Sequence, residues 1–247
     1  MYLQLGTRRQ APLLLWLLLI FSVAAPYSVS AARLSIDDMG DDGSYDEPLL
    51  DMVDDDDPVR KLLPDPQDPQ MFLPLKCSAC GAVIEEAIHL MRPAIIRHVE
   101  RKQRDAKKGI STKDVKLPHE YETVDAFEKL CRRVAMDYGL EMKSEKVPSL
   151  FFSKHHGIQR VRGGWMPFFL SSTCEELVDE EEDRLTSEIF AAAEAEAATI
   201  PTTHMDFLQR IAVRVRKAIC PYWSRAAGGC DPRGIPIDPR KEPSGDL

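Results

Sequence analysis

Cysteines carry the clearest chemistry in this 247-residue chain. They comprise a close pair, two single residues and a closing pair, namely Cys77, Cys80, Cys131, Cys174, Cys220 and Cys230. An even set can be fully oxidised, although spacing alone does not choose among the many pairings that it allows. A Cys-x-x-Cys pair at a helix start can instead exchange disulfides, because the helix dipole lowers a thiol pKa. The cysteines therefore serve either as structural disulfides or as a redox site at Cys77 and Cys80.

The N-terminal segment is typical of a secretory signal peptide. Arg8 and Arg9 precede the apolar run APLLLWLLLIFSVAA, and small residues follow. A membrane anchor is the alternative, but the run is shorter than the roughly 20 residues that span a bilayer, and Pro26 closes it. We predict that residues 1–31 are removed in the endoplasmic reticulum, a compartment in which disulfides persist.

The net charge of -8 comes largely from two acidic blocks, Asp37 to Asp57 and Glu175 to Asp183. Because nucleic acid requires a basic face, this balance argues against it as the main partner. The first block has few apolar side chains, so residues 32–71 are predicted to be an acidic, disordered leader. It does not match a calcium-binding loop, since Leu49 stands where the twelfth-position glutamate would be.

Helical periodicity begins after the proline-rich stretch, near Phe72. Three sets of apolar residues recur at steps of three and four. They are Cys77, Cys80, Val83, Ile84, Ala87, Ile88 and Met91; Phe127, Leu130, Cys131, Val134 and Tyr138; and Phe207, Leu208, Ile211, Ala212, Val215 and Ile219. Helix is also expected around Cys174 and from Leu185 to Thr199 on propensity. No strand alternation of comparable length occurs, so the fold class is predicted to be all-α.

Two other segments offer recognition surfaces. The stretch from Arg97 to Lys116 is strongly basic and is interpreted as a solvated helix extension and loop, with a site for an acidic partner as the alternative. The connection from Pro148 to Gly164 and just beyond is aromatic, with Phe151, Phe152, Trp165, Phe168 and Phe169. These rings are expected to pack over the core, and an exposed recognition patch is the alternative.

Several motifs together carry a family resemblance. KCSACGAV, LCRRVAMDYGLEMKSEKV, GGW followed by Pro167, and LSSTCEELVDE are similar to the canopy group of proteins, which are of the MIR-interacting saposin-like type. The likeness runs from about Lys76 to Cys230, most of the chain after the signal peptide. It implies a saposin-like helical domain over residues 72–232 with long loop insertions, notably at 140–165.

The resemblance also implies a disulfide pairing and a function. The saposin-like pattern has three nested bonds, which here join Cys77 with Cys230, Cys80 with Cys220, and Cys131 with Cys174. Members of the group are co-chaperones or folding factors of the endoplasmic reticulum lumen. They work with a major chaperone such as endoplasmin on secretory or membrane client proteins. No cofactor is expected.

The C-terminal tail, residues 233–247, bears on location. Members of the group end in retrieval signals of the lysine-aspartate-glutamate-leucine type, whereas this chain ends in Ser-Gly-Asp-Leu. The acid and the leucine are kept and the two preceding residues differ. We expect retention in the endoplasmic reticulum, with secretion as the alternative.

Two other function classes stay open. A thiol oxidoreductase would use Cys77 and Cys80, although the βαβ context that usual redox motifs have is absent from the pattern. A saposin-type lipid-binding protein would use the stripe from Phe207 to Ile219 and its cationic face, Arg210, Arg214 and Lys217. The same stripe also suits an ordinary core helix.

Metal and hydrolytic sites are not predicted. The pair Cys77 and Cys80 lacks a second close ligand pair for zinc. The histidines have no metal-ligand spacing of the HExxH kind, and there is no G-x-S-x-G or phosphate-binding glycine loop. The histidines of the chain are His89, His98, His119, His155, His156 and His204. The adjacent His155 and His156 are expected to be solvent-exposed, with a pH-sensitive contact as the alternative.

Overall fold

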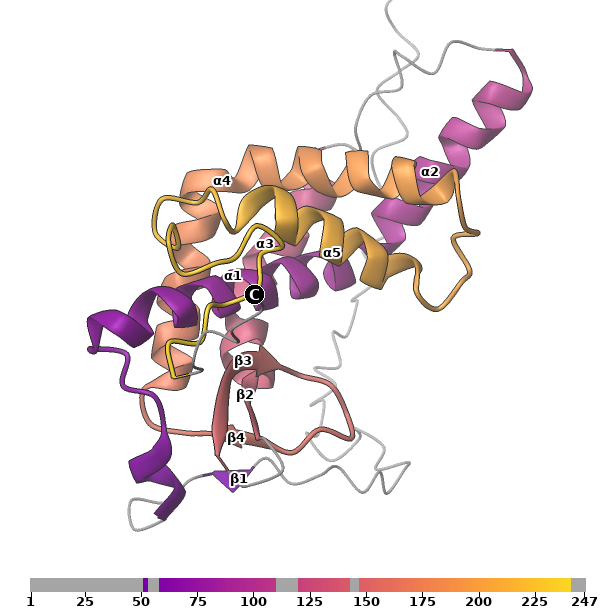
Figure 1. The fold of residues 1–247 in the computed structure, drawn as a ribbon. Helices are drawn as coiled ribbons and strands as arrows, with labels where there is room; N and C mark the ends of the chain where they lie inside the picture. Colours follow the sequence, from indigo (N-terminus) through magenta and orange to yellow (C-terminus); the bar gives the residue numbers. More distant parts are fainter. Residues whose placement is uncertain (1–50, 53–57, 110–119, 143–146, 241–247) are drawn as a thin grey trace, which may run out of the picture. The chain divides into compact units, whose positions relative to one another are not determined.

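The computed structural model describes residues 51–52, 58–109, 120–142 and 147–240 (Figure 1). Residues 1–31, most of the acidic leader and the Ser-Gly-Asp-Leu end therefore lie outside the described residues. The described elements are β1 (Asp51–Met52), a 3-10 helix η2 (Pro58–Leu62), α1 (Pro69–Leu90), α2 (Arg92–Lys107), α3 (Glu120–Asp137), β2 (Gly139–Met142), β3 (Pro148–Ser153), β4 (Arg160–Arg162), α4 (Met166–Ala197) and α5 (Phe207–Ile219).

Helix α1 lies at the centre and contacts α3, α4, α5 and β3 (Figure 1). The Asp68 side chain caps its start by accepting a hydrogen bond from the Gln70 backbone N–H at 2.9 Å, and Pro69 occupies the first turn. Pro93 lies in the first turn of α2, where a proline is tolerated and starts a new helix. All residues from Pro74 to Ile84 are buried. The predicted apolar set of α1 is buried as expected, but its other faces are covered as well.

The other helices bury the predicted faces. In α5, Phe207, Ile211, Val215 and Ile219 are fully buried, and the same holds for Leu130 and Val134 in α3 and for Tyr138 directly after it. The two helices expected around Cys174 and from 185 to 199 form one continuous helix, α4. A run of helix-favouring alanine and acidic residues with no internal proline or glycine explains that continuity.

The all-α prediction requires correction because a four-stranded sheet accompanies the helices. Its order is β1-β4-β2-β3, with β1 parallel to β4 and the other pairs antiparallel. Strands β2 to β4 occupy the segment that the resemblance marks as a long insertion. These strands are short, and β3 is buried along most of its length. They therefore lack the alternation of apolar and polar residues that indicates a strand in a sequence.

Two contacts join the sheet and the C-terminal turns to α1. The Phe152 backbone N–H donates a hydrogen bond to Ser78 Oγ at 2.8 Å, which ties β3 to α1. Gly229 packs against the backbone at the start of α1, where a Cβ would lie 2.1 Å from the Leu73 carbonyl oxygen. Only glycine allows that approach, and it brings the adjacent Cys230 to Cys77.

Candidate functional site

Three nested disulfides close the described domain. Cys77 bonds Cys230, Cys80 bonds Cys220 and Cys131 bonds Cys174, with Cα–Cα separations of 5.4, 5.9 and 5.3 Å. These are the pairs that the saposin-like resemblance implies. All six cysteines are oxidised, and none is free in the structure.

The close cysteine pair is not arranged as a dithiol site. Cys77 and Cys80 are both fully buried and bond different, distant cysteines. Helix α1 begins at Pro69, so Cys77 lies about two turns inside it, beyond the first turn in which a helix dipole acts. The expectation that this pair opens a helix is therefore wrong. The neighbouring Lys76 ammonium is also occupied, because it pairs with the Glu176 carboxylate.

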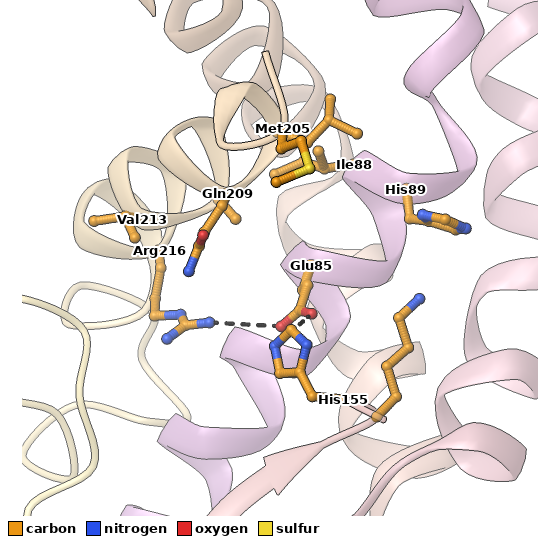
Figure 2. A pocket seen from close by; sticks show the side chains of 11 residues that line it. Glu85, Ile88, His89, His155, Met205, Gln209, Val213 and Arg216 are labelled. Atoms are coloured by element: carbon orange, nitrogen blue, oxygen red, sulfur yellow. Dashed lines mark ion pairs between the residues drawn. The ribbon is translucent and has the colours of Figure 1, made fainter. Parts of the chain in front are cut away.

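A cleft lies between α1, α5, the residues after β3 and the connection from α4 to α5 (Figure 2). It has a volume of about 390 Å³. Its lining is Glu85, Ile88, His89, Lys154, His155, Met205, Leu208, Gln209, Ala212, Val213 and Arg216. We call this recess the α1–α5 cleft.

One part of the α1–α5 cleft is apolar. Ile88 and Ala212 are buried, and Leu208 is partly buried against the core. Met205 and Val213 are exposed to 94% and 57%. Two large apolar side chains are therefore exposed to solvent beside a recess with an apolar lining.

The cleft also holds an arginine in a restricted position. The side chain of Arg216 passes two glycines, since a Cβ on Gly81 would lie 2.9 Å from its Nε and a Cβ on Gly234 would lie 2.7 Å from its Cγ. Its Nε is buried and has no hydrogen-bond partner among the described residues. Its Nη2 faces Glu85 Oε2 at 3.9 Å, an ion pair too long for a hydrogen bond (Figure 2).

The cleft lining includes two histidines, of which His155 contacts this ion pair. His155 Nε2 lies 3.5 Å from Glu85 Oε1, and His155 is largely exposed. Burial, followed by the nearby Lys154 ammonium, lowers the pKa of His89. His89 is therefore uncharged at neutral pH and leaves Lys154 and Arg216 as the permanent cations of the cleft.

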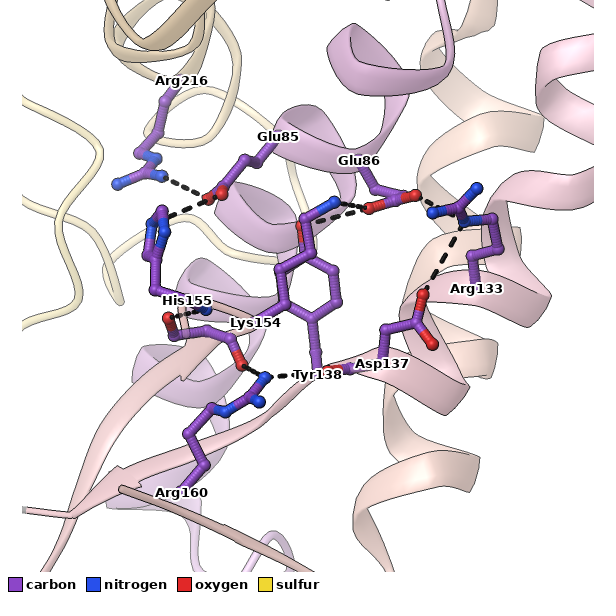
Figure 3. A network of polar contacts seen from close by, with 10 residues as sticks. Glu85, Glu86, Arg133, Asp137, Tyr138, Lys154, His155, Arg160 and Arg216 are labelled. Carbon is purple, nitrogen blue, oxygen red and sulfur yellow. Dashed lines mark hydrogen bonds and ion pairs between the residues drawn. The ribbon is translucent and has the colours of Figure 1, made fainter. Parts of the chain in front are cut away.

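A network of polar contacts next to the cleft supports its wall (Figure 3). Glu86 on α1 is fully buried and pairs with Lys154, while Arg133 Nε lies 2.8 Å from Glu86 Oε1 without hydrogen-bond alignment. The Tyr138 hydroxyl donates to Glu86 Oε2 at 3.4 Å. Burial, followed by the charges of Glu85 and Glu86, raises the pKa of Tyr138 far above its usual range, so the hydroxyl keeps its proton. The network fixes Lys154 between α1, α3 and the end of β3.

The other predicted residues are scattered. His98 is buried between α2 and α4, where its Nε2 lies 2.7 Å from Glu194 Oε1. His156 and His204 are exposed, and His119 lies outside the described residues. Of the aromatic connection, Phe152, Trp165 and Phe169 contact one another, whereas Phe168 is 82% exposed.

The basic stretch from Arg97 and the second acidic block both contact other elements of the fold. Between 97 and 109 the basic stretch is mostly helix α2, and Lys102 pairs there with Glu194. The second acidic block lies on α4, and its Glu180 accepts hydrogen bonds from Trp223 and Arg225. Part of each stretch therefore holds elements together.

Sequence reasoning missed the α1–α5 cleft. It assigned Arg210, Arg214 and Lys217 to a cationic face and did not single out Arg216. The available signal was the pair Glu85 and Glu86 in an otherwise apolar stretch, because carboxylates on a core helix need partners.

The comparisons with known proteins returned no matching family model, curated protein or solved structure. Within the described ranges, no helix is long and apolar enough to cross a membrane. No group of side chains suited to a metal ion occurs in that part of the chain either. Three disulfides fit a protein of the secretory pathway, either luminal or secreted.

Proposed function

We propose that this protein is a folding accessory of the endoplasmic reticulum lumen that acts by binding other proteins. The canopy-like, saposin-like motifs of the sequence support this role. In this proposal its partners are a major chaperone such as endoplasmin and secretory or membrane clients. Retention would rely on the C-terminal Ser-Gly-Asp-Leu.

The observation that carries the proposal is the α1–α5 cleft in a scaffold closed by disulfides. Disulfides between distant parts of the chain keep such a scaffold rigid, so a recess on it binds with little ordering cost. Exposed Met205 and Val213 next to a recessed Arg216 combine apolar contact with carboxylate recognition. Protein surfaces that bind polypeptide segments have this mixture.

Neither alternative class gains a supporting observation. A thiol oxidoreductase needs an accessible thiolate, whereas Cys77 and Cys80 are buried in separate disulfides. A saposin-type lipid protein would offer the apolar stripe of α5 to a bilayer, whereas that stripe is packed in the core.

The test uses the oxidised, mature chain and purified endoplasmin. Sedimentation velocity measures their complex, and the refolding yield of a reduced secretory client is measured with and without the chain. We expect a complex and a higher yield, both lowered by Met205→Glu combined with Val213→Glu. Met136→Glu is the matched control, because Met136 is 49% exposed on α3, outside the cleft.

Two outcomes would overturn this function. Reduction of an insulin disulfide by the chain, with loss on Cys80→Ala, would place it among oxidoreductases. The other is the absence of any complex and of any change in client yield with the unmodified chain.

A further inference from the structure

We propose that the α1–α5 cleft binds a polypeptide segment of a partner protein in which an apolar side chain lies next to a carboxylate. This inference rests on the proposed binding function and names the chemistry that the cleft selects. The apolar side chain would contact Ile88, Leu208 and Ala212, and the carboxylate would pair with Arg216.

The apolar part of the cleft has the features of a peptide anchor site. Ile88 and Ala212 belong to the core and Leu208 packs against it, so this part of the cleft is formed before a ligand binds. Met205 and Val213 stand above them and would be covered by the bound segment. Methionine is flexible and polarisable, which lets it adapt to different apolar side chains.

Arg216 is suited to the carboxylate because its guanidinium is held in place before binding. The two glycines admit its stem between α1 and the C-terminal turns, and its Nε is buried. Such a restrained fork loses little conformational entropy when it forms two parallel hydrogen bonds to a carboxylate. Its contact with Glu85, at 3.9 Å, leaves those hydrogen bonds unmade.

The charge around the cleft favours an acidic segment. Arg216 is the α5 cation that lines the cleft, whereas Arg210, Arg214 and Lys217 line a neighbouring recess in which the first two pair with Glu196. Lys154 lies on the opposite wall, where its ammonium pairs with Glu86. Arg216, whose one ion pair among the described residues is the 3.9 Å contact with Glu85, is therefore the cation that attracts an acidic segment to the cleft and repels a basic one.

Glu85 opposes the incoming carboxylate, which gives the inference a distinctive consequence. It faces both Arg216 and His155, at 3.9 and 3.5 Å. An incoming carboxylate would compete with it for the same guanidinium. Glu85→Gln should therefore strengthen binding, whereas a residue with a purely structural role would weaken binding or leave it unchanged when replaced.

The geometry favours a peptide over an anionic lipid surface. Insertion into a bilayer requires a broad apolar face, and the apolar face of α5 is buried. The exposed apolar groups at the cleft are two side chains beside a recess of about 390 Å³. Such a recess accommodates a few side chains of one segment.

The test measures fluorescence anisotropy of a short labelled peptide with leucine-aspartate pairs between glycine and serine residues. The matched probe replaces each aspartate with asparagine. For the oxidised full chain we expect about tenfold weaker binding of the asparagine probe, since charge-assisted hydrogen bonds are lost. Arg216→Gln should weaken the aspartate probe by a similar factor, and Glu85→Gln should tighten it about threefold.

Met205→Glu keeps the inference testable if Arg216→Gln fails to fold. Met205 is almost fully exposed, so its replacement leaves the core intact, and we expect weaker binding of the aspartate probe. Arg101→Gln on α2 is the control for charge alone and should bind as the unmodified chain does. Equal affinity for both probes, or unchanged affinity in Arg216→Gln and Met205→Glu, would overturn the inference.

Two results separate this inference from the proposed function. The cleft assignment fails and the folding role stands if neither probe binds the unmodified chain, while Arg216→Gln still forms the endoplasmin complex and still raises the client yield. If the aspartate probe binds as expected but the chain forms no complex and changes no client yield, the folding role fails alone. Binding of phosphatidylserine vesicles, without peptide binding, would replace the peptide with a lipid surface and overturn the inference.

Discussion

At the scale of single residues, Glu86 links the scaffold to the α1–α5 cleft. Its carboxylate is fully buried on the central helix and contacts Lys154 after β3 and both Arg133 and Tyr138 at the end of α3. A buried carboxylate without these partners would be costly, so they compensate for its desolvation. Glu86 also sets the position of Lys154 on the cleft wall.

We expect Glu86→Gln to lower the free energy of unfolding by about 2 to 3 kcal/mol, because Lys154 and Arg133 lose their charged partner. The loss stays below that of a fully buried pair, since both cations keep part of their side chain in water. Urea unfolding with the disulfides intact measures it. Glu85→Gln is the control and should cost less than about 1 kcal/mol, because its ion pairs are longer and more exposed. Equal costs for the two variants would contradict this role of Glu86.

At the scale of elements, Glu194 connects α4 to α2. Its Oε1 lies 2.7 Å from His98 Nε2, and its Oε2 pairs with Lys102. The His98 ring also lies against Phe190 with 5.1 Å between ring centroids. These contacts hold α2 on α4 through polar groups as well as apolar packing.

This link should make the α2–α4 contact sensitive to acid. Burial by itself raises the pKa of Glu194, but the hydrogen bonds from Lys102 and His98 outweigh it and hold the pKa below the ordinary glutamate value. A lowered folded-state pKa stabilises the fold above the ordinary value, and that contribution is lost as pH falls through the folded-state pKa. The stabilisation should therefore be complete near neutral pH and disappear in the acid range below about pH 4.5.

Glu194→Gln should reduce the acid-induced loss of unfolding free energy by roughly 0.5 to 1 kcal/mol, a modest value because the carboxylate is about one-third exposed. Urea unfolding at about pH 6 and about pH 3.5 measures the difference. Glu182→Gln, an exposed residue of the same helix, is the control. A pH dependence identical to that of the control would contradict the link.

At the scale of the whole molecule, the nested disulfides are not independent. The bonds Cys77–Cys230 and Cys80–Cys220 enclose 153 and 140 residues, so they close nearly the same loop. With one in place, the other closes only the difference, roughly 13 further residues. Cys131–Cys174 closes its own loop of 43 residues.

We expect removal of either outer bond by paired Cys→Ala changes to cost about 3 kcal/mol on the chain-entropy account. Removal of both should cost about 8 kcal/mol, more than twice one bond, because the second removal opens the full loop. Urea unfolding of the three variants measures this non-additivity, with the Cys131 and Cys174 pair left intact. Strictly additive losses would contradict it.

Sequence patterns predicted much of the helical framework and little of the cleft. Apolar spacing located α5 and the buried face of α3, because a helix on the surface of a core must repeat its apolar residues with the helical period. It did not reveal that α1 is buried on nearly all sides, since a central helix has no polar face. The short strands were missed for a related reason, because β3 is buried along most of its length.

The sequence by itself determined that six cysteines could pair completely and that several amphipathic helices must pack on one core. Only the tertiary structure brought Gly81, Gly234 and Arg216 together and placed the Arg216 guanidinium beside Glu85. The physical reason is the distance along the chain between the residues that interact. Helical periodicity depends on residues a few positions apart, whereas the cleft depends on close contacts between segments far apart in the chain.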